Sequence, residues 1–214
     1  MQLIGMLDSP YVRRVAISLQ LLGLRFEHQP VSVFREFDRF QAINPVVKAP
    51  TLICDDGRIL MDSTLILDYA EALADADRTL RPAAIDEFGR MLQLVGLALA
   101  VCEKSVQIVY ERTLRPTEKQ HEPWLNRVSG QLLAACDVLE TELKNRPLAA
   151  SSTTINQAGI SIAVAWQFAQ QMVPDVVPAV NYPALRVFST KTEALQAFAA
   201  APHGPGIYQA QTAG

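Results

Sequence analysis

The sequence predicts an α+β protein in which a mixed α/β domain precedes an all-helical domain. Up to about residue 80, short apolar runs that suit strands alternate with amphipathic runs that suit helices. Beyond it the apolar residues recur with helical period only, and prolines separate the runs. A polar segment that ends in Pro82 lies between the two parts. We therefore predict a first domain over residues 1–78, a linker over 79–85 and an all-helical domain over 86–214.

The predicted elements of the first domain follow from cap and turn residues between the apolar runs. Ser9 is a favoured helix N-cap, Pro10 suits the first helical position, and Gly23 is typical of a helix end. Gly57 supplies the positive φ that the Asp-Asp-Gly turn of a tight hairpin needs. The elements are a strand over Gln2–Met6, a helix over Pro10–Leu22, a strand over Arg25–Val31, a looser segment over Phe34–Ile43, hairpin strands over Thr51–Cys54 and Arg58–Met61, and a helix over Ser63–Ala74.

Four runs of helical period make up the predicted second domain. They cover Ile85–Leu114, Pro123–Lys144, Asn156–Met172 and Ala184–Ala200, with proline-bearing breaks between them. The apolar residues of the first run span more than one helix face, so this helix can serve both a core and a partner contact.

Charge and hydropathy exclude several classes of function. The formal net charge is −3, and no lysine- and arginine-rich run occurs, so neither nucleic acid nor an anionic membrane is an expected partner. The N-terminal residues lack a basic lead and a long apolar core, and we find no uncharged apolar stretch of about 18 residues or more. We expect a cytoplasmic protein with neither signal peptide nor spanning helix.

The cysteines and histidines are too scattered to predict a metal site. The cysteines form no C-x-x-C pair, so buried thiols in a reducing compartment are expected. No two histidines have a spacing that would place them on one helix face. The residues concerned are Cys54, Cys102 and Cys136, and His28, His121 and His203.

Three positions of the first domain point to a ligand site as well as to helix caps. Ser9 follows a buried strand and begins a helix, in the crevice where open α/β sheets bind ligands. Pro50 begins an apolar strand, a position typical of a cis peptide that leaves the neighbouring backbone available. Ser63 begins a helix as its N-cap, and such a helix start can hold a carboxylate. Each serine alone is better explained as a cap, but the three positions together, in the same half of the chain, favour a ligand site.

Five motifs follow one another along the chain. Ser9 to Arg13 reads S-P-Y-V-R, Asn44 to Leu52 reads N-P-V-V-K-A-P-T-L, and Asp62-Ser63 is followed by Ile66 and Tyr69. In the helical part, Asn156 to Ile160 reads N-Q-A-G-I and Tyr182 to Leu185 reads Y-P-A-L. In this order and spacing the motifs resemble those of cytosolic glutathione S-transferases of the bacterial, serine-type kind, over essentially the whole chain.

The resemblance implies a thioredoxin-like first domain, and glutathione as co-substrate without a metal. Only the thiolate of glutathione attacks well, so the resemblance implies that Ser9 stabilises this anion against a small hydrophobic electrophile, in detoxification. It implies that Ala49, beside a cis Pro50, pairs its backbone with the cysteine moiety. Ser63 would hold the γ-glutamyl carboxylate, and Asp62 would receive the α-amino group or act as a second capping residue.

Other parts of the implied site are less specific. The glycine carboxylate of glutathione needs a cation, for which Lys48 is favoured over Arg35 and Arg39. Tyr11 and Tyr110 are the electrophile-pocket candidates. The family resemblance also implies a two-fold homodimer. For Arg13 we expect a surface salt bridge.

Departures from the family pattern leave other functions open. Val47 replaces a glycine and should stiffen the loop before Pro50, while Gly159 replaces an aspartate and removes a reciprocal cap worth about 1 kcal/mol. The first alternative is a non-catalytic glutathione-binding or regulatory module. The second, a glutathione-dependent disulfide reductase or peroxidase, conflicts with Ser9, because serine cannot form a mixed disulfide.

Overall fold

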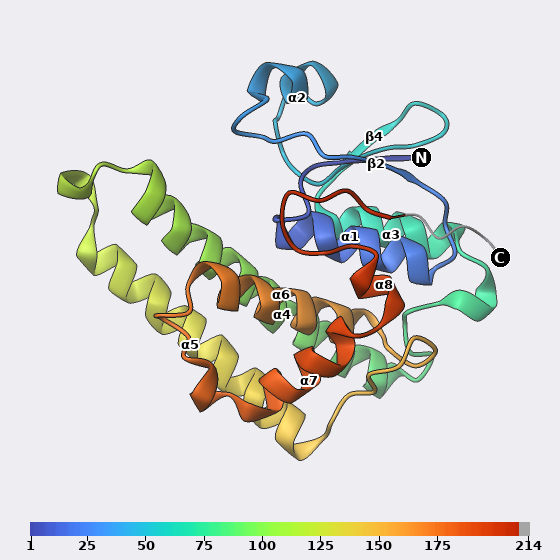
Figure 1. Ribbon diagram of the computed structural model, residues 1–214. Coiled ribbons are helices and arrows are strands. Elements are labelled where there is room, and N and C mark those ends of the chain that lie inside the picture. Colours follow the sequence, from blue (N-terminus) through green and yellow to red (C-terminus); the bar gives the residue numbers. More distant parts are fainter. Residues whose placement is uncertain (210–214) are drawn as a thin grey trace. The chain divides into compact units, whose positions relative to one another are not determined.

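The computed structural model describes residues 1–209, and these form two compact units (Figure 1). The first unit comprises Met1–Leu80 together with the described residues from Ala194 onward, and the second comprises Arg81–Glu193. The prediction of one domain over residues 86–214 differs from this division. The C-terminal segment joins the first unit because it is bonded there: Arg13 Nε donates to the carbonyl of Ala201 at 2.7 Å.

A four-stranded mixed sheet forms the centre of the first unit, in the order β2-β1-β3-β4. Strand β1 (Gln2–Ile4) pairs in parallel with β2 (Glu27–Gln29) and antiparallel with β3 (Thr51–Ile53). Strand β3 continues through the predicted hairpin to β4 (Ile59–Met61). The strands are shorter than predicted, but their identity and order along the chain are as expected.

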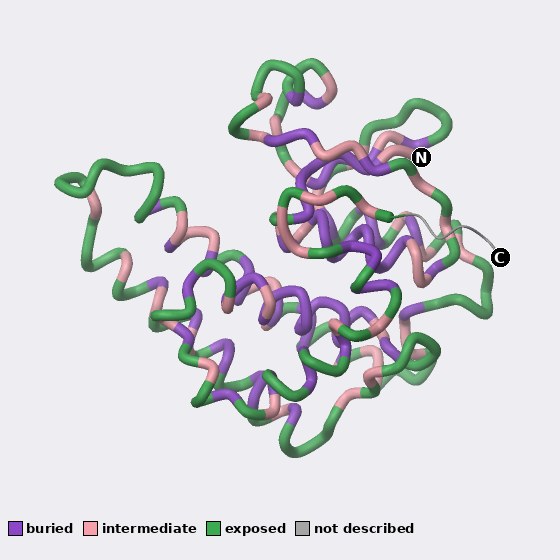
Figure 2. Tube along the Cα trace, in the orientation of Figure 1, coloured by how far each residue is buried: buried purple, intermediate pink, exposed green. Residues whose placement is uncertain are grey.

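Helices pack against this sheet and against one another within the first unit. Helix α1 (Pro10–Leu21) contacts α3 (Ser63–Leu73) and the short α8 (Gln196–Ala199). It is buried over most of its length (Figure 2). The segment predicted to be loose contains helix α2 (Phe37–Ile43), whose Phe40 packs with Ile4 of β1 in a buried cluster. A 3-10 turn over Ala76–Arg78 follows α3.

The second unit is all-helical, as predicted. Its helices are α4 (Ile85–Leu114), α5 (Glu122–Asn145), α6 (Gln157–Met172) and α7 (Pro183–Glu193), with 3-10 turns over Thr117–Lys119 and Ala179–Asn181. Helix α4 packs against α5 and α6, and α6 is buried along most of its length (Figure 2). The run predicted over Ala184–Ala200 is two helices, α7 and α8, which belong to different units.

Helix α4 bears on the expectation that the chain has no spanning helix. Among the described residues, it is long and apolar enough to cross a membrane by length and composition alone. A core helix of a soluble protein meets the same criteria, and α4 packs against two neighbours within its unit. The helix is therefore weak evidence for a membrane.

The start of α6 explains the unusual glycine in its first turn. Asn156 is the N-cap, as predicted, and its Oδ1 accepts the N–H of Gly159 at 3.1 Å. A Cβ added at Gly159 would lie 2.9 Å from Cγ1 of Ile155, closer than real Cβ contacts allow. Glycine at position 159 thus leaves room for the side chain of Ile155, a role that the sequence motif alone does not indicate.

All three cysteines are buried, as predicted. Burial raises the pKa of the Cys136 thiol to about 12. Within residues 1–209, no group of three or more His, Cys, Asp or Glu side chains is arranged to hold a metal ion.

Candidate functional site

The first part of the candidate site is the junction between β1 and α1. Ser9 is the N-cap of α1 and Pro10 follows at the first helical position, which confirms the predicted helix start. The Ser9 Oγ accepts the N–H of Val12 at 3.4 Å, a long and therefore weak hydrogen bond. The hydroxyl proton is not used in this bond, because the oxygen acts as acceptor. Ser9 thus keeps a donor for a ligand at a helix N-terminus.

The second part is the loop before β3, in which the Ala49–Pro50 peptide is cis. The buried Asn44 holds this loop: its Nδ2 donates to Thr51 Oγ1 at 2.9 Å, and its Oδ1 accepts the N–H of Val46 at 3.0 Å. The Thr51 hydroxyl in turn donates to the carbonyl of Lys48 at 2.8 Å. Neither Asn44 nor Thr51 was predicted to hold this loop, although an Asn-Pro step signals a turn.

Gly5 allows these two parts to meet. A Cβ on Gly5 would lie 2.6 Å from Cγ2 of Val12 in α1 and 3.1 Å from Cβ of Ala49. Its φ of +136° also lies in a region that favours glycine. The end of β1 therefore approaches both the first turn of α1 and the cis-proline loop, which brings the Ser9 and Ala49 segments together.

The third part is the start of α3, where the predicted cap is off by one residue. Asp62, not Ser63, is the N-cap: its Oδ1 accepts the N–H of Thr64 at 2.9 Å, and its φ is +72°. Ser63 is the first helical residue and is buried. Its Oγ accepts an N–H from Arg14 Nη1 at 3.2 Å. The capping assignment of Ser63 is wrong because the backbone turns into the helix one residue earlier.

Lys48 and Asp62 form an ion pair across the site. Lys48 Nζ donates to Asp62 Oδ2 at 3.3 Å, and both side chains are partly exposed. Burial opposes ionisation of Asp62, but the Thr64 N–H and the Lys48 ammonium hold the pKa of its carboxyl below the ordinary value. The family resemblance implied that Lys48 binds the glycine carboxylate of glutathione and that Asp62 binds its α-amino group. In this structure the two side chains bind each other.

The remaining cation candidates differ in their surroundings. Arg39 donates to Glu36 at 2.7 Å in an exposed pair, and Arg35 is also exposed. Arg13, expected in a surface salt bridge, is 1% exposed, and its guanidinium lies 5.8 Å from the ring centroid of Phe198. The expectation is wrong for Arg13, because the C-terminal segment covers this side chain.

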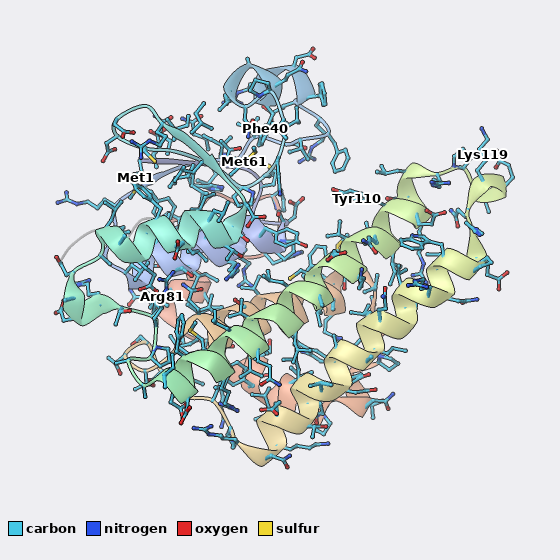
Figure 3. The ribbon with its side chains drawn as sticks, turned by 180° about the vertical axis from the view of Figure 1, so that it is seen from behind. Met1, Phe40, Met61, Arg81, Tyr110 and Lys119 are labelled. Atoms are coloured by element: carbon cyan, nitrogen blue, oxygen red, sulfur yellow. The ribbon has the colours of Figure 1, made fainter. Side chains whose placement is uncertain are left out.

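The tyrosines proposed for the electrophile belong to different units. Tyr11 lies in the first turn of α1 and is partly exposed. Tyr110 lies in the last part of α4, where Figure 3 labels it, and is 44% exposed. The same figure labels Met61 of β4, whose sulfur lies 3.7 Å from Asn44 Nδ2. Met61 was not predicted to border the loop.

Comparison with known proteins agrees with this arrangement. The family model described as "Glutathione S-transferase, N-terminal domain" matches residues 3–78. The uncharacterised GST-like protein YibF of Escherichia coli K12 is 30% identical over 165 residues, which are 77% of this chain and 80% of YibF. The chain belongs to the glutathione S-transferase family. Its thioredoxin-like first domain and helical second part are the predicted fold.

Two further proteins are similar to this chain over different lengths. The maleylacetoacetate isomerase of Pseudomonas aeruginosa is 29% identical, over 59% of this chain and 63% of the isomerase. A glutathione transferase family member from Pseudomonas fluorescens Pf-5, solved with bound glutathione, is 27% identical with a TM-score of 0.79. The alignment covers 94% of this chain and 97% of that protein.

Proposed function

We propose that this protein is an enzyme that activates the thiol of glutathione as thiolate, for attack on a small hydrophobic electrophile. The observation that carries this proposal is that the first turn of α1, whose N-cap is Ser9, and the cis-proline loop both closely approach Gly5. The family membership and the glutathione bound to the Pseudomonas fluorescens relative support the choice of ligand.

In the proposed mechanism, Ser9 is the catalytic residue. Its hydroxyl donates a hydrogen bond to the glutathione sulfur, and the N-terminus of α1 contributes its positive dipole end. Both interactions favour the charged form, so they lower the pKa of the bound thiol and raise the fraction of thiolate at neutral pH. Met6 and Leu7, which precede the helix, carry no donor for this task.

The other residues bind glutathione rather than react with it. The backbone of Ala49, beside Pro50, would pair with the cysteine moiety, and Ser63 would hold the γ-glutamyl carboxylate at the start of α3. Lys48 and Asp62 would exchange their mutual ion pair for the glycine carboxylate and the α-amino group of the ligand. An exposed pair of this kind costs little to separate, because its net contribution is about 0–1 kcal/mol.

Tyr11 and Tyr110 are the proposed contacts of the electrophile, each within its own unit. Both side chains have exposed surface, and a phenol can donate to a polar atom of a substrate while its ring packs on an apolar part. We further propose a homodimer in the cytoplasm. A mass of about twice 23.5 kDa by light scattering supports the dimer, and the mass of one chain would contradict it.

Two measurements test the proposed activity. Retention on immobilised glutathione separates a binder from a non-binder, and conjugation of a generic aryl halide then separates an enzyme from a regulatory module. The relation to maleylacetoacetate isomerase favours one second candidate, a glutathione-dependent isomerisation. Glutathione that is regenerated with an unsaturated diacid substrate, and not consumed, would favour the isomerase.

Substitution of Ser9 tests the catalytic assignment. Ser9→Ala should slow conjugation about 10- to 1000-fold and raise the pKa of the bound thiol, because one donor to the anion is lost. Ser9→Thr is the matched control, since it keeps both the hydroxyl and a capping side chain. Unchanged turnover and an unchanged thiol pKa in Ser9→Ala would reject the role and leave the backbone amides as stabilisers.

A further inference from the structure

Arg14 is a buried cation that the sequence motifs do not assign to the site. It lies in α1, five residues after Ser9, and only 4% of it is exposed. Arginine remains protonated in proteins, and burying its charge is costly unless its N–H groups and charge are used. The fold therefore places a permanent positive charge inside the first unit, on the same helix as the proposed catalytic serine.

The guanidinium of Arg14 contacts the first two residues of α3. Its Nη1 lies 3.2 Å from Ser63 Oγ and 3.2 Å from Thr64 Oγ1, and α1 and α3 pack against each other. Arginine has no acceptor atom, so both hydroxyl oxygens must accept in these contacts. One lone pair of Ser63 is then occupied, and its proton is directed away from Arg14. The contact turns Ser63 into a donor for another group.

The charge at this helix start favours an anion. The first turn of α3 lies at the positive end of the helix dipole, where the capping Asp62 accepts the Thr64 N–H. The Arg14 guanidinium adds a full charge behind them, at a buried position where the effective dielectric constant is lower than in water. A ligand carboxylate at Ser63 would thus meet an oriented O–H donor and a cation behind it.

We propose that Arg14 is the positioning residue of the glutamyl end of the site: it orients the Ser63 hydroxyl and makes binding depend on the negative charge of the γ-glutamyl carboxylate. This inference rests on the proposed function, because it takes glutathione as the ligand. Arg14 acts through Ser63 and away from the sulfur, so it should control glutathione affinity and KM more than kcat at saturation.

The test compares two ligands in wild type and variants by calorimetry: glutathione, and glutathione whose γ-glutamyl α-carboxylate is converted to an amide. In wild type the amide should bind about 10- to 100-fold more weakly than glutathione, because a charge-assisted hydrogen bond is lost. In Arg14→Met the affinity for glutathione should fall by a similar factor, about 10- to 100-fold, while the affinity for the amide changes less than about threefold. The kcat at saturating glutathione should remain close to that of wild type.

Two further variants separate the proposed role of Arg14 from a loss of folding and from a general loss of positive charge. Arg14→Lys retains the charge but loses the planar fork, so it should fold even if Arg14→Met does not, and it should raise the KM for glutathione several-fold without affecting the amide. Arg58→Met is the matched control, since Arg58 is an exposed hairpin arginine paired with Asp56. It should leave both affinities unchanged.

These measurements distinguish a failure of the proposed function from a failure of the role proposed for Arg14. A wild-type protein that does not bind glutathione would reject the proposed function. If wild type binds glutathione but an Arg14 variant loses affinity for both ligands equally, Arg14 has only a structural role and the inference is rejected. The same conclusion follows if folded Arg14→Met binds glutathione like wild type.

Discussion

His28 links the end of β1 to the C-terminal segment, and its protonation should loosen that link. Its Nδ1 accepts the N–H of Tyr208 at 3.0 Å, and its Nε2 lies 2.7 Å from the carbonyl oxygen of Gly5. A carbonyl only accepts and an N–H only donates, so Nε2 carries the proton and Nδ1 the lone pair. The docked segment therefore requires the neutral imidazole in this tautomer.

Acidification should destabilise the docked C-terminal segment, because the fold lowers the pKa of His28. Burial lowers the pKa of His28, against the smaller opposing effect of the Gly5 hydrogen bond. The contribution of neutral His28 to stability is thus complete above the ordinary histidine pKa of about 6.5 and is lost as the pH falls toward the lowered value. A proton on Nδ1 would face the Tyr208 N–H, which removes one hydrogen bond and leaves two partly buried donors without an acceptor.

The expected increase in the population of the open segment follows from the loss of that single hydrogen bond. A buried unsatisfied donor costs about 1–3 kcal/mol, so the open state of the segment should become about 5- to 150-fold more populated. Other contacts remain: Tyr208 stacks on Phe26 with ring centroids 4.5 Å apart, and Arg13 still holds Ala201. The opening should therefore be local to the residues around Tyr208 and should precede global unfolding.

Hydrogen–deuterium exchange measures this opening. After correction for intrinsic exchange rates, protection of the peptide around Tyr208 at about pH 5.5 should be lower than at about pH 7.5, with the fall beginning near the ordinary histidine pKa of about 6.5. His28→Gln is the control, because glutamine does not titrate: its peptide should exchange at a rate independent of pH. Equal protection of the wild-type peptide at both pH values, or a pH dependence that survives in His28→Gln, would refute the argument.

Two other predictions concern stability, each measured by urea unfolding. Val47 has a φ of +53°, a conformation that costs an L-residue about 1–2 kcal/mol. The free energy of unfolding of Val47→Gly should therefore be higher than that of Val47→Ala by about 0.5–1 kcal/mol, and the reverse order would contradict the strain. Glu140 is buried, yet the Ala184 and Leu185 amides and Lys144 hold its pKa below the ordinary value, so its contribution is present above pH about 4.3 and lost below. Glu140→Gln should cost about 1–3 kcal/mol at neutral pH and flatten this acid loss; an unchanged acid loss would contradict it.

Local sequence patterns predicted the structure correctly where a residue bonds to its near neighbours in the chain or restricts its own backbone. The Ser9 cap, the cis peptide at Pro50 and the Asn156 cap were predicted from side chains that bond within three residues or restrict their own backbone. Helix α4 has the predicted bounds, Ile85–Leu114, because its apolar period is long and uninterrupted.

The start of α3 shows where local patterns are ambiguous. Asp62 and Ser63 are both good N-cap residues, and either is followed by a helical run. The choice depends on the backbone of Asp62, whose φ of +72° turns the chain into the helix one residue earlier than predicted. Asp62 follows β4 directly, and its carboxylate contacts Lys48, 14 residues earlier in the chain, a contact that the two cap residues alone do not indicate.

The two adjacent arginines of α1 show what sequence alone does not reveal. Charged residues in a helix suggest a surface position, yet Arg13 and Arg14 are both buried. Their partners, the carbonyl of Ala201 and the hydroxyl of Ser63, are 188 and 49 residues away along the chain. Backbone carbonyls carry no sequence signal, so the return of the C-terminal segment to the first unit is not predictable from residue types.

Helix α1 and its N-cap therefore connect three parts of the first unit through three polar side chains. Ser9 at its N-terminus serves the proposed chemistry, Arg14 supports the start of α3, and Arg13 fastens the C-terminal segment. The same segment has a second connection, to the end of β1: the Tyr208 N–H donates to His28, which donates to the carbonyl of Gly5. Because Gly5 closely approaches Ala49 of the cis-proline loop, this second connection ends beside a residue proposed to bind glutathione. The packing of the C-terminal segment is thus part of what holds this site in shape.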